Sequence, residues 1–172
     1  RVTGPLTETL EGAHRGPEHF HGVTTVVTKL LAIAAPDVAV FGSKDAQQLR
    51  VIERLVRDLH LPVRIVRAPT VREPDGLALS SRNVRLSRGA RQQALSLSAA
   101  LFAARDAVVA GARDRETILS PALAVLDRHD AAPEYLELCD SEDLSSLETV
   151  TGDATIVIAA TIGGVRLIDT ID

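Results

Sequence analysis

Polar side chains of complementary chemistry gather in the segment Gly42-Ser43-Lys44-Asp45, which directly follows a short apolar run. Lys44 and Gln48 are four residues apart and Asp45 and Gln48 are three apart, the spacing of neighbours on one helix face. A helix that starts after a parallel strand also offers free N–H groups to an anion. The segment therefore predicts either a nucleotide site or an ordinary solvated first turn.

A second polar run, Leu79-Ser80-Ser81-Arg82-Asn83, combines two hydroxyls with a guanidinium in consecutive positions. Such a set can hold phosphate oxygens through charge-assisted hydrogen bonds. The alternative is a serine-rich turn that caps the next segment. The run ends a long stretch without periodicity, from Ala68 to Asn83, and long ordered loops of this kind are usually functional.

Two other candidates are weaker. His19 and His21 are accompanied by no third ligand at a plausible spacing, so packing around the first helix is favoured over metal binding. Cys139 lies in a predicted strand with no histidine nearby, which indicates a buried thiol rather than a nucleophile. No metal site is predicted.

The apolar pattern of the first half predicts an α/β arrangement that would position the first polar segment. Helical spacing runs from Val23 to Ala34 and from Leu49 to Leu59, and short apolar strands are predicted at 37–42 and 63–66. Prolines at 36 and 62 end the two helices. The order helix, strand, helix, strand implies a parallel sheet covered by helices.

After Ser87 the pattern changes to that of a small α+β domain. An alanine-rich helix ends at Gly111, and a second helical stretch runs to about Arg128, with Pro121 expected to kink or restart it. Strands are predicted at 135–138, 155–161 and 165–168, the last two joined by a tight turn at Gly163-Gly164. The predicted domains are residues 1–86 and 87–172.

Composition narrows the class of protein. The 172 residues are 45% hydrophobic, enough for one ordinary domain or two small ones. The net charge of -4 lacks the basic surplus of a nucleic-acid binder. One cysteine and the absence of an apolar run of roughly 18 residues predict a cytoplasmic protein that is not in a membrane. A chain without methionine that begins at Arg1 is expected to start within a longer protein.

Three runs and the ending of the chain resemble the pantothenate synthetase family in order and spacing. The runs begin at His19 (H-F-H-G-V-T-T-V-V-T-K-L), Phe41 (F-G-S-K-D-A-Q-Q-L) and Asp75 (D-G-L-A-L-S-S-R-N), and the ending begins at Gly163 (G-G-V-R-L-I-D). The resemblance covers nearly the whole chain. It implies a partial Rossmann-like domain of the nucleotidyltransferase superfamily, followed by an α+β lid domain.

The resemblance also implies a two-step reaction in which pantoate attacks the α-phosphate of Mg-ATP and β-alanine then displaces AMP from the pantoyl adenylate. The implied cofactors are ATP and Mg²⁺. Lys44 would stabilise the charge on the transferring phosphate and Gln48 would bind pantoate. The remaining residues that the resemblance assigns to ATP are Gly42, Ser43, Asp45, Val71, Leu79, Ser80, Ser81 and Arg82.

Departures from the family pattern leave alternatives open. The family's N-terminal strand and H-x-G-H motif have no counterpart here, so a missing N-terminal segment is an expected partner and this chain alone is expected to be inactive. Ser43 and Ala46 replace a usual glutamate and a usual aromatic residue, which leaves room for a divergent ligase that adenylates another small acid. A non-catalytic binding or assembly module and a homodimer also stay open.

Overall fold

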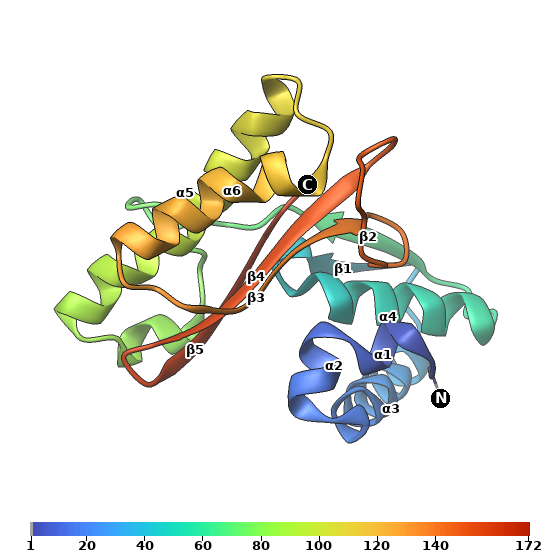
Figure 1. Cartoon of the computed structure of the whole chain (residues 1–172). Coiled ribbons are helices and arrows are strands. Elements are labelled where there is room, and N and C mark those ends of the chain that lie inside the picture. Colours follow the sequence, from blue (N-terminus) through green and yellow to red (C-terminus); the bar gives the residue numbers. More distant parts are fainter. Residues whose placement is uncertain (1) are drawn as a thin grey trace. The chain divides into compact units, whose positions relative to one another are not determined.

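The computed structural model describes residues 2–172, apart from the side chain of Pro17, and the chain divides into two compact units (Figure 1). Unit 1 runs to Pro69 and includes Glu142–Ser145, whereas unit 2 comprises Thr70–Ser141 and Ser146–Asp172. The loop from Thr70 to Leu86, expected in the first domain, thus lies in unit 2. Its contacts explain this, because Leu77 is buried in the core of that unit.

Unit 1 contains the predicted helix, strand, helix, strand order. Its elements are α1 (Pro5–Glu8), α2 (Leu10–Arg15), α3 (Pro17–Ala34), β1 (Val38–Gly42), the 3₁₀ turn η1 (Ser43–Asp45), α4 (Ala46–Asp58) and β2 (Arg64–Ala68). The strands β1 and β2 are parallel, with Val38 opposite Arg64 and Gly42 opposite Ala68. This part of the fold prediction is confirmed.

The start of unit 1 differs from the prediction. Two short helices, α1 and α2, were not expected, and α3 begins at Pro17 rather than Val23. Proline suits the first helical position because the N–H that it lacks would have no partner within the helix. The turn between α1 and α2 is tight, since a Cβ at Gly12 would overlap the carbonyl oxygen of Thr7. Short polar helices of this kind carry no clear periodicity.

The core of unit 1 is formed mainly by α3 and α4, and partly buried residues of the two strands pack against it. Phe20 and Leu31 of α3 pack with Val51 and Ile52 of α4, and both residues of α4 are fully buried. The helix α3 ends as predicted before Pro36, with Ala35 in the left-handed region at φ 41° and its N–H bonded to Leu31 O. Packing of α4 fixes the position of the turn that precedes it.

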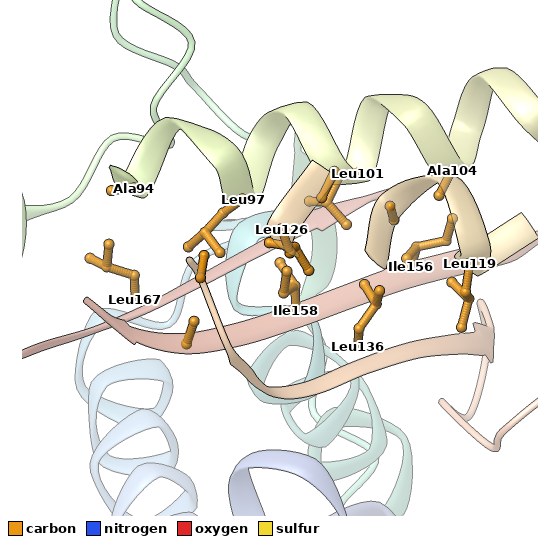
Figure 2. Close-up of a cluster of buried hydrophobic side chains, with 14 of the residues drawn as sticks. Ala94, Leu97, Leu101, Ala104, Leu119, Leu126, Leu136, Ile156, Ile158 and Leu167 are labelled. Atoms are coloured by element: carbon orange, nitrogen blue, oxygen red, sulfur yellow. The ribbon is translucent and has the colours of Figure 1, made fainter. Parts of the chain in front are cut away.

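Unit 2 is an antiparallel sheet covered by two helices. Its elements are the 3₁₀ turn η2 (Ser81–Arg85), α5 (Arg88–Val109), α6 (Arg115–Arg128), β3 (Pro133–Asp140), β4 (Ala154–Ile162) and β5 (Val165–Ile171), and the strand order is β3-β4-β5. Figure 2 shows Leu97 and Leu101 of α5 and Leu126 of α6 directed towards Ile158 of β4. The predicted α+β class of this part is confirmed.

Local sequence features of unit 2 act mostly as predicted. Gly163 and Gly164 have φ values of 56° and 74°, so they form the expected tight turn between β4 and β5. Ser87 caps α5 by accepting a hydrogen bond from the N–H of Ala90. The expectation of a restart at Pro121 is wrong, because α6 is continuous through this residue. None of the described helices has the length and apolar character needed to cross a membrane.

Candidate functional site

The first polar segment lies at the carboxyl end of β1. Gly42 is the last residue of this strand and is extended, at φ -74° and ψ 135°. Ser43, Lys44 and Asp45 form the 3₁₀ turn η1, and α4 begins at Ala46. The carboxyl ends of parallel strands are where open α/β sheets bind ligands. The predicted placement of this segment between a strand and a helix is therefore confirmed.

The expectation that Lys44, Asp45 and Gln48 share one α-helical face is wrong. Lys44 and Asp45 precede α4, and Asp45 has the non-helical angles φ -95° and ψ 62°. The three-residue and four-residue spacing argument applies only within a regular helix, so it does not fix these side chains relative to Gln48. Asp45 also makes no side-chain hydrogen bond to the first N–H groups of α4.

Lys44 is mostly shielded but only loosely paired. Its side chain is 18% exposed, and Nζ lies 3.8 Å from Oδ2 of Asp45, whose side chain is 49% exposed. An ion pair of this length with an exposed partner is weak. The ammonium group can therefore turn to another anion at little cost in free energy.

Adjacent glutamines at the start of α4 have different environments. Gln47 is 4% exposed, and its Nε2 donates to Leu6 O at 2.9 Å and Thr9 O at 2.8 Å, while Oε1 accepts from Glu11 N at 2.8 Å. Gln47 thus ties α4 to the two short N-terminal helices. Gln48 is partly exposed and forms no hydrogen bond with its side chain among the described residues, so it remains able to bind a ligand.

The loop that carries the second polar run folds back on itself as a small hairpin. Leu79 N donates to Val71 O at 2.9 Å, and Glu73 N donates to Leu77 O at 2.8 Å. Gly76 closes the predicted turn with a φ of 96°. Val71 and Leu79 are consequently opposite each other, and both are more than half exposed, at 63% and 56%.

One buried ion pair anchors this hairpin within unit 2. Arg72 Nη1 donates to Oδ2 of Asp169 at 2.6 Å, and Nη2 donates to Oδ1 at 3.1 Å. Asp169 is 2% exposed and belongs to β5. The guanidinium of Arg72 also stacks over the ring of Phe102, with 5.1 Å from Cζ to the ring centroid. These contacts place the loop in unit 2 rather than unit 1.

A second group of charges holds the tip of the hairpin. Arg91 Nη2 donates to Glu73 at 2.6 Å and to Asp75 at 2.7 Å. Hydrogen bonds from Arg91 hold the pKa of both carboxyls below their usual range, and the two carboxylates raise the pKa of Arg91. Both carboxylates therefore stay ionised over the neutral range. Sequence reasoning missed this cluster, although acidic residues beside a Pro-Asp-Gly turn were visible.

The hydroxyls and the guanidinium of the run have defined local roles. Ser80 Oγ accepts from the N–H of Arg82 at 3.2 Å, so the predicted capping interpretation holds for Ser80. Arg82 Nη1 donates to Arg166 O at 3.1 Å. Ser81 is exposed. Capping uses only an acceptor lone pair of Ser80, so its O–H remains available as a donor to an anion.

The weaker candidates lie where the sequence places them. His19 and His21 belong to α3; the ring of His19 packs 5.0 Å from that of Phe20, and burial, followed by the charge of Arg15, lowers its pKa. Cys139 is a free thiol, 1% exposed in β3. Within residues 2–172 as described, no group of three or more His, Cys, Asp or Glu side chains could hold a metal ion.

Each unit thus offers a set of groups suited to an anionic ligand. Unit 1 presents an ammonium and an amide beside the carboxyl end of a parallel strand. Unit 2 presents the hydroxyls of Ser80 and Ser81 and the guanidinium of Arg82 at the turn η2. The apolar side chains of Val71 and Leu79 in the preceding hairpin are exposed. Cationic and hydroxyl donors recognise phosphate oxygens, and exposed apolar side chains can pack against a ring. Each set by itself is therefore a candidate site for an anionic ligand.

Comparison with known proteins gives a consistent answer. The family model for pantoate-beta-alanine ligase matches residues 1–172. The pantothenate synthetase of Heliobacterium modesticaldum is 51% identical over 95% of this chain and 58% of its own length. The solved pantothenate synthetase of Thermus thermophilus is 43% identical with a TM-score of 0.94; the match covers 99% of this chain and 62% of the other.

A third relative was solved as a ligand complex. The pantoate-beta-alanine ligase of Francisella tularensis, complexed with beta-gamma ATP and beta-alanine, is 30% identical with a TM-score of 0.73. The match covers 99% of this chain and 56% of the other. The chain therefore spans about three fifths of the length of the relatives that it matches.

Proposed function

Because this chain belongs to the pantoate-beta-alanine ligase family, we propose that it carries part of the site for the ATP-dependent condensation of pantoate with β-alanine. The observation that carries the proposal is the family match along all 172 residues, which includes both polar segments. The ligands of the Francisella tularensis relative, beta-gamma ATP and beta-alanine, support the same substrates.

The proposed chemistry has two steps. A carboxylate oxygen of pantoate attacks the α-phosphorus of ATP, and the bond to the bridging oxygen breaks with loss of pyrophosphate. The amine of β-alanine then attacks the acyl carbon, loses a proton and displaces AMP, which leaves an amide. Negative charge builds on the transferring phosphate in the first step, so fixed cations and donors lower that barrier.

The residues divide between the two substrates by their chemistry. We assign the stabilisation of the α-phosphate to Lys44, whose ammonium is only loosely paired. We assign pantoate to Gln48, since the neighbouring Gln47 is fully engaged. The ribose is assigned to the Gly42 backbone and Asp45, with Ser43 beside them.

The hairpin of unit 2 is assigned to the adenine and the outgoing phosphates. Val71 and Leu79 offer exposed apolar surface for a ring. Ser80, Ser81 and Arg82 offer donors for phosphate oxygens. Unit 2 would act as a lid that keeps water from the acyl adenylate, which is prone to hydrolysis.

Mg²⁺ is proposed only as the companion of ATP. The described residues include no cluster of acidic or histidine ligands that fits a protein-bound metal, so no step is assigned to one. Magnesium usually keeps several waters and binds substrate phosphates with few protein ligands. A cytoplasmic location, a homodimer and a contribution to the site from a further N-terminal segment are likewise proposals.

A second candidate is a ligase for another small hydroxy acid. It is favoured by Ser43 and by Ala46, which is 6% exposed at the first position of α4 and fills less space than an aromatic side chain. Comparing pantoate with other hydroxy acids in ATP–pyrophosphate exchange distinguishes the two ligases. A higher kcat/KM for another acid would favour the second candidate.

The test of the proposed function is pantoate-dependent exchange of pyrophosphate into ATP. It should be measured in the full-length protein, meaning this chain together with any residues encoded before it, and in the 172-residue chain alone. We expect exchange in the former, pantothenate on addition of β-alanine, and little exchange in the latter. A full-length protein that binds ATP without pantoate-dependent exchange would support the non-catalytic alternative.

A further inference from the structure

The buried side chain of Asn83 joins the two ends of the run Leu79–Arg82. Its Nδ2 donates at 3.0 Å to the carbonyl oxygen of Ala78, directly before the run, and its backbone N–H donates at 3.0 Å to Ser80 O. Asn83 is 6% exposed. One residue therefore closes this turn from both sides, with hydrogen bonds that are shielded from competing water.

The other hydrogen of the Asn83 amide is donated to Glu73. Nδ2 lies 2.6 Å from Oε1 of Glu73, and Oε2 accepts from Nη2 of Arg91 at 2.6 Å. Bonds from Arg91 first and Asn83 second lower the pKa of Glu73, so its carboxylate remains a charged acceptor at neutral pH. Two side chains thus connect the polar run to the first turn of α5, where Arg91 lies.

We propose that Asn83 and Glu73 are positioning residues for ATP, which hold Ser80, Ser81 and Arg82 in the conformation that receives phosphate oxygens. This inference rests on the proposed function. A turn that is ordered before the nucleotide arrives loses less conformational entropy on binding. Loss of either residue should therefore weaken the binding of ATP. The binding of pantoate should stay the same, because Gln48, to which we assign pantoate, belongs to unit 1.

The first experiment measures binding of Mg-ATP and of pantoate to the full-length protein by calorimetry, for the wild type and Asn83→Ala. We expect the Kd of ATP to rise about tenfold, the scale of one hydrogen bond, and that of pantoate to change by less than about twofold. A folded Asn83→Ala variant with lower thermal stability and an unchanged ATP Kd would overturn the inference.

A second variant covers the case in which Asn83→Ala does not fold. Glu73→Gln keeps an oxygen for Asn83 but removes the charge that binds Arg91, so the ATP Kd should rise about threefold, less than for a full hydrogen bond. Amide hydrogen exchange at residues 79–83 should also become faster. Glu137→Gln is the matched control, because it breaks the Arg115–Glu137 ion pair elsewhere in unit 2. An ATP Kd and exchange rates equal to those of the wild type in Glu73→Gln would refute the positioning role.

Wild-type activity separates this inference from the proposed function. Absence of pantoate-dependent ATP–pyrophosphate exchange in a wild-type protein that binds ATP contradicts the proposed function. The ATP Kd values of the variants then still decide the positioning role, because they do not depend on turnover. If the wild type catalyses exchange and a folded Asn83→Ala variant has the same KM for ATP, only the positioning role is contradicted.

Discussion

Replacing Arg72 by alanine should destabilise unit 2 far more than removing an exposed arginine. The side chain of Arg72 is 17% exposed and that of Asp169 is 2% exposed, so solvent screens their ion pair very little. The variant leaves the Asp169 carboxylate buried without its two guanidinium donors, although the bond from Thr170 N remains. The carboxylate then stays buried with fewer donors to offset its desolvation.

The size of the effect follows from this burial. Removing one partner of a buried ion pair costs about 3–5 kcal/mol, and the lost stacking on Phe102 adds roughly 0.5–1 kcal/mol. Domains are stable by about 5–15 kcal/mol, so the loss is a large fraction of the total. The hairpin that Arg72 anchors should therefore loosen together with the sheet.

The assay is urea denaturation of the 172-residue chain, followed by circular dichroism and by hydrogen exchange resolved to each unit. Arg105→Ala is the matched control, because Arg105 also stacks on Phe102, at 5.0 Å, but is 46% exposed and pairs with the exposed Asp106. Its loss of stacking and of an exposed ion pair should together cost about 1 kcal/mol or less.

A double variant separates the buried charge from lost packing. Arg72→Met combined with Asp169→Leu removes both charges, so it should be more stable than Arg72→Ala. A loss below about 1 kcal/mol for Arg72→Ala, or an effect equal to that of Arg105→Ala, would refute the reasoning from burial.

Other predictions concern the candidate site in the full-length protein. Lys44→Ala should lower the single-turnover adenylation rate by about 10²- to 10³-fold with a smaller change in ATP binding, since its charge acts on the transition state; a wild-type rate would remove Lys44 from the site. Gln48→Ala should raise the pantoate KM by the equivalent of about 1–3 kcal/mol while ATP affinity stays near normal, as steady-state kinetics would show. Arg82→Ala should weaken ATP more than pantoate, and equal losses in calorimetry would argue against its role. Arg91 lowers the pKa values of Glu73 and Asp75 in the folded state. The stability that the two ionised carboxylates add is therefore present above their unfolded pKa values, about 4. It is lost as the pH falls through the lower folded-state pKa values. Urea midpoints of the wild type and Arg91→Ala should therefore converge on acidification, and a constant difference down to the acid limit would contradict this linkage.

Elements with strong local signals could be predicted from the sequence. The apolar runs of β1 and β2 and the helical stripe of α4 placed Gly42 and Lys44 at a strand end, as observed. The Gly163-Gly164 turn was equally clear, because two consecutive positive φ values favour glycine. The family resemblance, which family comparison confirms, added what no local pattern could supply.

Contacts between distant residues could not be predicted in this way. Gln47 binds groups 36 to 41 residues away, and Arg72 binds Asp169 across 97 residues. Neither pair has a periodic or motif signal, so the sequence predicted a role for Gln48 but not the contacts of the neighbouring Gln47. The prediction that Lys44 shares a helical face with Gln48 failed because Lys44 lies in the three-residue turn η1, before α4 begins. The apolar pattern of the sequence does not show where this turn ends.

The two interpretations of the serine-rich run, as a cap and as a phosphate ligand, turn out to be compatible. Ser80 caps η2 through its oxygen, and Nη1 of Arg82 donates to Arg166 O, so local bonds already orient both groups. A guanidinium has five N–H donors on three nitrogens, so the contact through Nη1 leaves capacity for an anion. Side chains that are held in place by part of their hydrogen-bonding capacity lose less entropy when a ligand engages the rest. The structural roles of Ser80 and Arg82 therefore favour their proposed role in binding phosphate.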